Sequence, residues 1–228
     1  MFIRKMEYMA TQLKESDSRN FSVAMPTIGM FSYTLMGHEI IDLVGLTDST
    51  IARHSEPRIE GLTSTWKEQS LNTRYLLRRA PDYIVFSTDI KPSAPAEQAL
   101  FLFEPFRESY RSIGWYYQSD PVNRPGEGGL VLAHKRVRPV TGNMEPDYPV
   151  EFVQHYKRGL EYSNSGATAE ALKEFYKARQ FTVGEPYEPL LYQIGVLYMR
   201  IGEHEKAVEL MDQAVAQDSM VFEAHKDL

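Results

Sequence analysis

The last third of this 228-residue chain matches itself when it is shifted by 36 residues. The matched pairs combine small and large residues, namely Tyr156 with Tyr192, Gly159 with Gly195, Tyr162 with Tyr198, Gly166 with Gly202, Ala171 with Ala207, Phe175 with Met211, and Ala178 with Ala214. In a helix–turn–helix repeat, small residues let two helices approach each other, and large ones fill the space between repeats. The pattern therefore predicts two stacked helical hairpins over residues 151–228.

The spacing within each copy resembles the tetratricopeptide repeat, a helical hairpin of about 34 residues. The motifs that carry the resemblance are Gly159-x-x-Tyr162 with Ala171-x-x-x-Phe175, and Ile194-Gly195-x-x-Tyr198 with Ala207-x-x-x-Met211. Arg158 departs from the pattern, which has leucine there, and neither copy has the usual terminal proline in register. The resemblance implies a surface for a protein or peptide partner rather than a catalytic site.

One apolar row is predicted to face inward across both repeats. It comprises Val153, Tyr156, Leu160, Tyr192, Val196 and Met199. In one interpretation this row lines a groove for a peptide. In the other, the preceding part of the chain covers it, because stacked repeats need neighbours to bury their faces and two repeats are a short array. We expect the residues after Asp218 to form a capping helix.

Three further segments are expected ahead of the repeats. Residues 1–20 are polar and weakly amphipathic, which indicates a leading helix. Residues 21–138 alternate short apolar runs with helical stretches. Residues 139–150 contain three prolines and a glycine, a composition that opposes helix and predicts a linker.

The 21–138 segment is predicted to be a small α/β domain. Strands are expected at 21–25, 39–44, 82–87, 113–118 and 129–134, and helices at 26–36, 63–79 and 96–103, with a short helix capped by Asp48. Alternating strands and helices argue for a partly parallel sheet in three layers, with added antiparallel strands at the end.

A second resemblance covers about residues 21–88. Its motifs are Val23-Ala24, Gly29-x-x-x-Tyr33, the run from Ile40 to Arg53 (Ile-Ile-Asp-Leu-Val-Gly-Leu-Thr-Asp-Ser-Thr-Ile-Ala-Arg), and Tyr75-Leu76-Leu77-x-Arg79-x-Pro81-Asp82-Tyr83-Ile84. In this order they resemble the segment after the last membrane helix of polytopic GT-C type glycosyltransferases, the arabinosyl- and mannosyltransferase-like enzymes that use polyprenyl-phosphate-linked sugars. In those enzymes the segment is extracytoplasmic.

The resemblance implies a protein that does not transfer sugar alone. The family's catalytic carboxylate lies on an early loop between membrane helices, and no run here has the roughly 20 apolar residues of such a helix. We therefore expect a non-catalytic, extracytoplasmic domain of a membrane glycosyltransferase, or one associated with it, with the membrane part and a glycan as further partners. No secretory signal is visible in residues 1–14, so a cytoplasmic location stays open.

The Gly45–Asp48 turn is the first candidate ligand site. Asp42 and Asp48 flank this turn at the end of a predicted strand, where open α/β sheets bind ligands, and Arg53 and His54 follow. In the alternative interpretation, Asp48 caps a helix, Asp42 bonds local backbone and Arg53 pairs with an acid.

The second candidate is Trp66 with Lys67, which could contact a sugar or a phosphate. The alternative is that Thr63 and the hydroxyl residues after it only begin a helix, with Glu68 supporting its first turn.

Composition narrows the remaining chemistry. The chain has no cysteine, which excludes disulfides, thiolate metal sites and a cysteine nucleophile. Its six histidines are scattered, so neither a metal site nor a cofactor is expected. The net charge of −6 argues against a nucleic-acid partner. Besides the glycosyltransferase association, two hypotheses stay open: a stand-alone adaptor, and a small enzyme with a pocket at the Gly45–Asp48 turn.

Overall fold

The computed structural model describes residues 2–88, 91–118, 128–182 and 187–217. Within these residues one mixed sheet contains five strands in the order β2-β1-β3-β5-β4. The strands are β1 (Ser22–Met25), β2 (Glu39–Asp42), β3 (Tyr83–Ile84), β4 (Tyr110–Gln118) and β5 (Gly128–Arg136). β1 pairs in parallel with β2 and β3, whereas β5 is antiparallel to both β3 and β4. The predicted partly parallel sheet with added antiparallel strands is confirmed.

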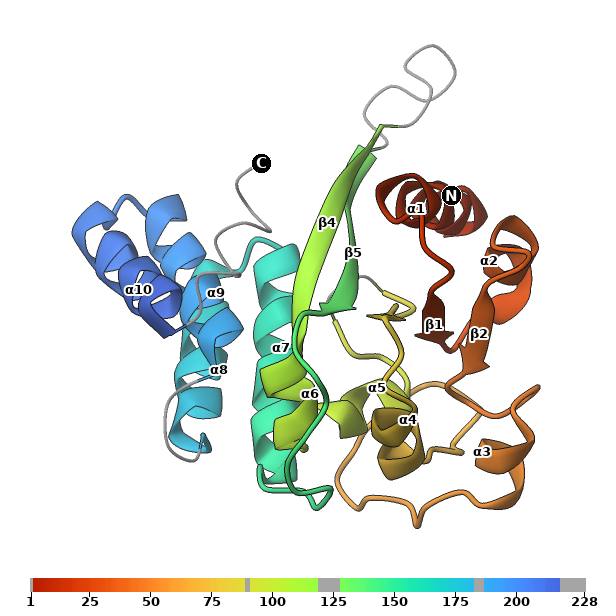
Figure 1. Ribbon diagram of the computed structural model, residues 1–228. Coiled ribbons are helices and arrows are strands. Elements are labelled where there is room, and N and C mark those ends of the chain that lie inside the picture. The colour runs from red at the N-terminus through yellow and green to blue at the C-terminus, as the bar shows by residue number, and fades with distance from the viewer. Residues whose placement is uncertain (1, 89–90, 119–127, 183–186, 218–228) are drawn as a thin grey trace.

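Helices cover both faces of this sheet (Figure 1). On one face, α1 (Phe2–Ser16) and α2 (Ile28–Thr34) bury Met9, Leu13 and Phe31 against the sheet. The other face carries α5 (Pro95–Leu100) and α6 (Glu104–Ser109) in a second cluster with Phe86. The short helices α3 (Ser49–Arg53) and α4 (Thr73–Arg79) flank the sheet near its parallel strands. The predicted three-layer arrangement follows from these two apolar clusters.

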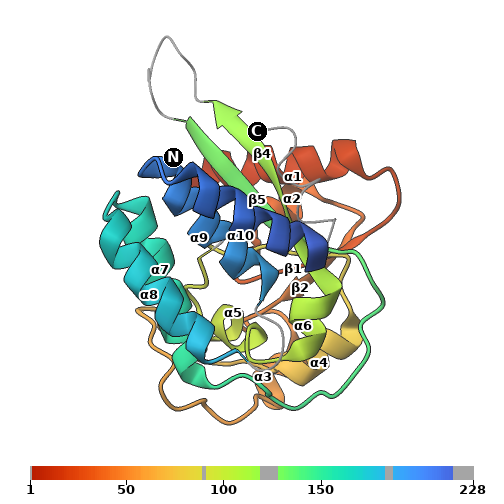
Figure 2. The same cartoon turned by 90° about the vertical axis from the view of Figure 1, so that its left-hand side faces the viewer.

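The C-terminal region is helical and consists of paired helices, as predicted. Its helices are α7 (Val150–Asn164), α8 (Thr168–Gln180), α9 (Glu188–Arg200) and α10 (His204–Gln217). Seen from the side of this region, they lie in front of the sheet (Figure 2). The predicted capping helix after Asp218 lies outside the described residues.

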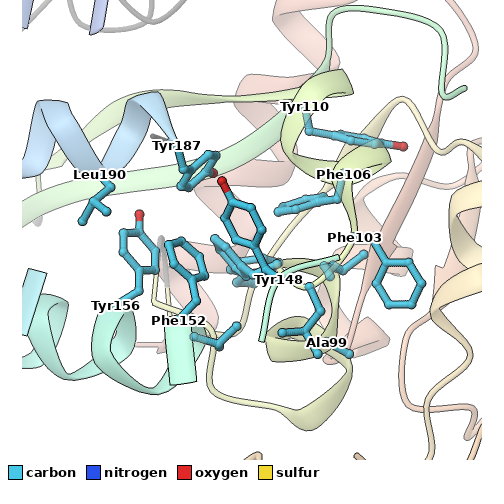
Figure 3. Packing of buried hydrophobic residues seen from close by; sticks show 14 of the residues in the cluster. Ala99, Phe103, Phe106, Tyr110, Tyr148, Phe152, Tyr156, Tyr187 and Leu190 are labelled. Carbon is cyan, nitrogen blue, oxygen red and sulfur yellow. The ribbon is translucent and has the colours of Figure 1, made fainter. Parts of the chain in front are cut away.

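The sheet and the helical pairs share one hydrophobic core. A single cluster of buried residues runs from Ala24 and Ile41 in the sheet to Leu210 and Ala214 in α10. Aromatic rings make the connection, since the centroid of Phe101 lies 5.4 Å from that of Tyr156 and 6.1 Å from that of Tyr187. Figure 3 shows Tyr156 and Tyr187 in this cluster, near Phe152 and Tyr148. The helical pairs therefore pack directly against the sheet region.

The segment predicted as a linker is bound to the sheet region. Residues 139–149 form no helix or strand, as their prolines require. However, the side chain of Tyr148 is buried, and the guanidinium carbon of Arg107 lies 3.4 Å from the centroid of its ring. Asp147 accepts hydrogen bonds from Arg107 and, at 2.8 Å, from the backbone amide of Glu104. These contacts hold the start of α7 against the sheet region.

The predicted helix over 63–79 is wrong in its first ten residues, because only Thr73–Arg79 is helical. Asn72 caps this helix by accepting from the amide of Tyr75 at 2.9 Å, and the Glu56 carboxylate accepts from the amides of Thr73 and Arg74. The helix thus begins where two acceptors satisfy its first amides. The helix α6, which begins just after Phe103, was not predicted.

Candidate functional site

The two helical hairpins repeat each other in their close crossings. A Cβ built on Gly159 of α7 would lie 2.4 Å from the Phe175 ring of α8. At the equivalent position in α9, a Cβ on Gly195 would lie 3.0 Å from the side chain of Met211 in α10. Ala171 and Ala207, on the opposing helices, are fully buried. The small residues that match at the 36-residue offset are therefore those at which helices touch.

The turns inside the hairpins are equivalent too. Gly166 and Gly202 follow the ends of α7 and α9 with φ of +80° and +82°, a conformation that favours glycine. The amide of Ala167 donates to the carbonyl of Tyr162 at 2.9 Å, and that of Glu203 donates to the carbonyl of Tyr198 at 3.0 Å. This closure of a helix end is the Schellman motif, so each hairpin turns in the same way.

The two hairpins are stacked through α8 and α9. The hydroxyls of Tyr176 and Tyr198 lie 3.0 Å apart, and burial raises the pKa of Tyr176 to about 12. Arg200 on α9 donates to the backbone carbonyl and the hydroxyl of Ser163 on α7, both at 3.1 Å. These bonds fix the second hairpin on the first one.

The row predicted to face inward divides into a covered half and an open half. Val153, Tyr156 and Leu160 of α7 are buried, and Tyr156 packs against Phe101 of the sheet region. In α9, by contrast, Tyr192 and Val196 are only partly buried.

Met199, the last residue of the predicted row, is 46% exposed, so it is not covered by the rest of the chain. The buried stripe of α9 consists of Leu190, Leu191, Ile194 and Leu197, which lie on other faces than Met199. Gly159 and Gly195 are buried in both repeats, whereas Leu160 is buried and its equivalent Val196 is only partly so, because the sheet region packs on α7.

The two ends of α9 differ in their contacts. Arg200 follows Met199 and is exposed. The start of α9 is anchored instead, where Glu188 forms an ion pair with Arg111 of β4 at 2.8 Å and both side chains are nearly buried. One end of α9 is thus fixed to the sheet, and toward the other end Val196 is partly buried and Met199 is exposed.

The acids of the Gly45–Asp48 turn bind the turn itself. Asp42 is buried and accepts from the amides of Val44 at 3.1 Å and Thr47 at 2.7 Å. Asp48 accepts from the amides of Thr50 and Ile51, as an N-cap does, and from the hydroxyl of Tyr75 at 3.2 Å. These contacts match the structural interpretation of both acids.

The other predicted ligand residues are exposed or lie in another segment. Arg53 and His54 are exposed. Lys67 is exposed as well, and Trp66 is partly buried in the irregular segment before α4, where its amide bonds to the hydroxyl of Ser64. Among the described residues, no group of three or more His, Asp or Glu side chains could hold a metal ion.

Two hollows lie elsewhere on the surface. One, of about 450 Å³, is lined by Glu104, Glu108, Ser109, Arg138, Pro139, Thr141 and Gly142. The other, of about 370 Å³, is lined by Thr63, Ser64, Thr65, Lys91, Ser93, Lys157 and Glu161. Sequence reasoning placed a site near the second hollow but on Trp66 and Lys67, because it assigned the preceding hydroxyls to a helix start.

Comparisons with known proteins divide along the chain. A family model described as a domain of unknown function (DUF8728) matches residues 3–138. The photosystem I assembly protein Ycf3 from Cuscuta gronovii is 30% identical over 80 residues, which are 34% of this chain and 47% of that protein. Ycf3 from Cuscuta obtusiflora matches equally. The chain thus spans about half of the length of these relatives. No solved structure matches.

Proposed function

This chain belongs to the DUF8728 family, and we propose that it is an adaptor whose helical region binds a partner protein. In this proposal α7 to α10 are two tetratricopeptide-type repeats, and the family domain is the platform that holds them. The observation that carries the proposal is the division of the inward row, which leaves Val196 and Met199 accessible on α9.

The repeated geometry supports the tetratricopeptide assignment. Close glycine crossings, buried alanines and Schellman turns recur in both hairpins at the same offset. Repeat arrays of this kind present one face of their first helices as a binding surface. Here that face of the first repeat is buried against the sheet region, so we expect the partner to bind at the second repeat.

The similarity to Ycf3 supports the same function. The name of that protein describes assembly of photosystem I, and Ycf3 contains tetratricopeptide repeats. The similarity covers about half of Ycf3, 47% of its length. It does not show that this chain takes part in assembling photosystem I. It supports the narrower idea that the helices here bring proteins together.

The glycosyltransferase association has no support in these comparisons, and it stays a prediction of the resemblance, as does an extracytoplasmic location. Across the described ranges, no helix combines the length and the apolar character needed to span a bilayer. A binding role for the second repeat is independent of which compartment the protein occupies.

The proposal is tested with the full chain, because the helical region shares its core with the sheet. Met199→Glu places a charge on the proposed surface, and Val208→Glu makes the same change on α10, where the side chain is 55% exposed. Proteins captured by the wild type and by Val208→Glu, but lost with Met199→Glu, would support the proposal. Thermal unfolding of each variant confirms that folding is unchanged. Identical capture by all three would overturn it.

A further inference from the structure

The hollow of about 370 Å³ lies where α7 meets the sheet region, and every side chain that lines it is polar. Four hydroxyls come from two loops, Thr63–Thr65 and Ser93. Lys91 adds an ammonium group, and α7 contributes Lys157 and Glu161. The volume falls within the range of about 300–1,000 Å³ that is usual for small-molecule pockets, although those are mostly lined by apolar residues and this one is not.

The two loops are held by buried groups of α5. The Ser64 hydroxyl donates to the carbonyl of Ser93 at 2.7 Å, which ties the loops together. Gln98, itself buried, donates to the carbonyls of Thr63 at 2.8 Å and Ser93 at 3.0 Å. The fully buried Glu97 accepts from the amide of Ala94 at 2.9 Å. The hydroxyl wall of the hollow is therefore built on the core of the protein and is preorganised.

The two lysines bring more positive charge to the hollow than one acid balances. Lys157 donates to the carbonyl of Thr63 at 2.7 Å, and Lys91 lies 3.3 Å from a carboxylate oxygen of Glu161. An ammonium group has three N–H donors, and each of these contacts uses one. Burial is the largest cause that lowers the pKa of Lys157, and the charge of Lys91 also lowers it, whereas Glu161 and Glu97 raise it. An anion bound near both ammonium groups would favour their charged forms.

We propose that this hollow binds the phosphate group of a small phosphate monoester. A phosphate offers acceptors alone, which complements the hydroxyls of Thr63 and Thr65 and the ammonium groups of Lys91 and Lys157. The hollow is large enough for the phosphate and a short polar group attached to it. This site is distinct from the protein-binding surface on α9, and the two can be tested separately.

The hydroxyl residues of this site adjoin Trp66 and Lys67, which the sequence analysis proposed as contacts to a sugar or a phosphate. Thr63, Ser64 and Thr65 precede Trp66 and Lys67 directly, and only the hydroxyl residues are among those that line the hollow. The Ser64 hydroxyl already donates to the carbonyl of Ser93, so Thr63 and Thr65 are the residues of this motif whose hydroxyls are offered to a ligand. Binding would also join α7 to the sheet region, since the lining comes from both.

The test follows backbone amide NMR signals of Thr63, Ser64 and Ser93 during titration of the full chain at constant ionic strength. The ligands are glycerol phosphate, inorganic phosphate and, as a neutral control, glycerol. We expect saturable shifts with glycerol phosphate, weaker binding of inorganic phosphate and no shifts with glycerol. Absence of saturable shifts would overturn the site, and equal affinities for the two anions would overturn the assignment to a monoester.

Variants locate the binding. Lys91→Gln and Lys157→Gln are each expected to weaken glycerol phosphate binding about tenfold or more, because a charged donor is lost. Lys173→Gln, on the exposed face of α8, removes the same charge elsewhere and is expected to leave the affinity unchanged. Glu161→Gln is expected to increase it. Equal weakening by Lys173→Gln and Lys91→Gln would overturn the site, and Lys91→Gln decides the matter if Lys157→Gln fails to fold.

Discussion

The crossing of α7 and α8 at Gly159 gives the sharpest test of the repeat architecture. In Gly159→Ala, the added methyl would lie 2.4 Å from two ring carbons of Phe175 and 2.9 Å from a third. Phe175 is fully buried, and its ring packs against Tyr156, with centroids 5.9 Å apart. The ring therefore cannot turn away, and the helices have to separate.

The magnitude follows from two opposing terms. Overpacking a core by one methyl group costs up to about 3 kcal/mol, whereas replacing glycine by alanine within a helix gains about 1 kcal/mol. We expect Gly159→Ala to lower the free energy of unfolding by about 2 kcal/mol. At Gly195 the nearest atom, 3.0 Å away, belongs to the flexible side chain of Met211, so Gly195→Ala should stay within about 0.5 kcal/mol of the wild type.

Urea unfolding followed by circular dichroism measures both variants. A second comparison adds Phe175→Leu, which removes the ring atoms that the methyl would meet. In that background Gly159→Ala should cost at least about 1 kcal/mol less than it does alone, as a coupling between touching residues. If Gly159→Ala is as stable as the wild type, or if the loss is the same with leucine at position 175, the proposed crossing is wrong.

Three further predictions concern the sheet region and its junction with the helices. Burial lowers the pKa of His134 to about 4, so the unfolded state binds the proton more tightly; stability should fall as pH drops from about 6.5 to 4, by on the order of 3 kcal/mol, and unfolding of His134→Leu should show a weaker dependence over that window. Asp48→Ala should destabilise the protein by about 1 kcal/mol in urea titrations because α3 loses its cap, whereas Asp48→Asn, which keeps an acceptor, should cost less. Arg111→Met should cost about 3–5 kcal/mol because it removes one member of a buried ion pair, and adding Glu188→Leu should restore most of that loss; unfolding of the single and double variants shows whether it does.

The helical region was the most predictable part of the chain from sequence. Its helices are specified by contacts between residues that recur at one offset, such as Gly159 with Phe175 and Gly195 with Met211. Two copies of the same pattern allow each to be checked against the other. The cap of α3 was predictable for a related reason, because Asp48 acts on amides two and three residues away.

The start of α4 was not predictable, because it depends on a distant residue. The sequence after Thr63 has helical spacing, but the Ser64 hydroxyl bonds to the amide of Trp66 and to the carbonyl of Ser93 instead. Such local side-chain bonds compete with helix formation. The first amides of α4 are satisfied by Glu56, which lies 17 residues before Thr73. No local pattern contains that information.

The candidate site shows the same limit. The sequence drew attention to residues 63–67, but the partners of that loop, Lys91 on another loop and Lys157 on α7, come from two other parts of the chain. The turn at Asp42 and Asp48 looked like a site because carboxylates after a strand are also what a turn needs for its own amides. A ligand site and a structural turn are distinguished by whether the carboxylate oxygens already accept local hydrogen bonds, and the sequence alone does not show this.

The covered half of the inward row explains why a two-repeat array can be stable here. Stacked repeats bury their faces on neighbours, and an isolated pair would leave Val153, Tyr156 and Leu160 in water. In this chain Phe101 and the segment around Tyr148 take the place of a preceding repeat, since they pack on α7 within the same core. The sheet region therefore covers the first hairpin as a preceding repeat would, and it leaves part of the second hairpin exposed. Moving the open surface to the first repeat would require uncovering that core, so a partner that competes with Phe101 for Tyr156 would have to unfold the junction.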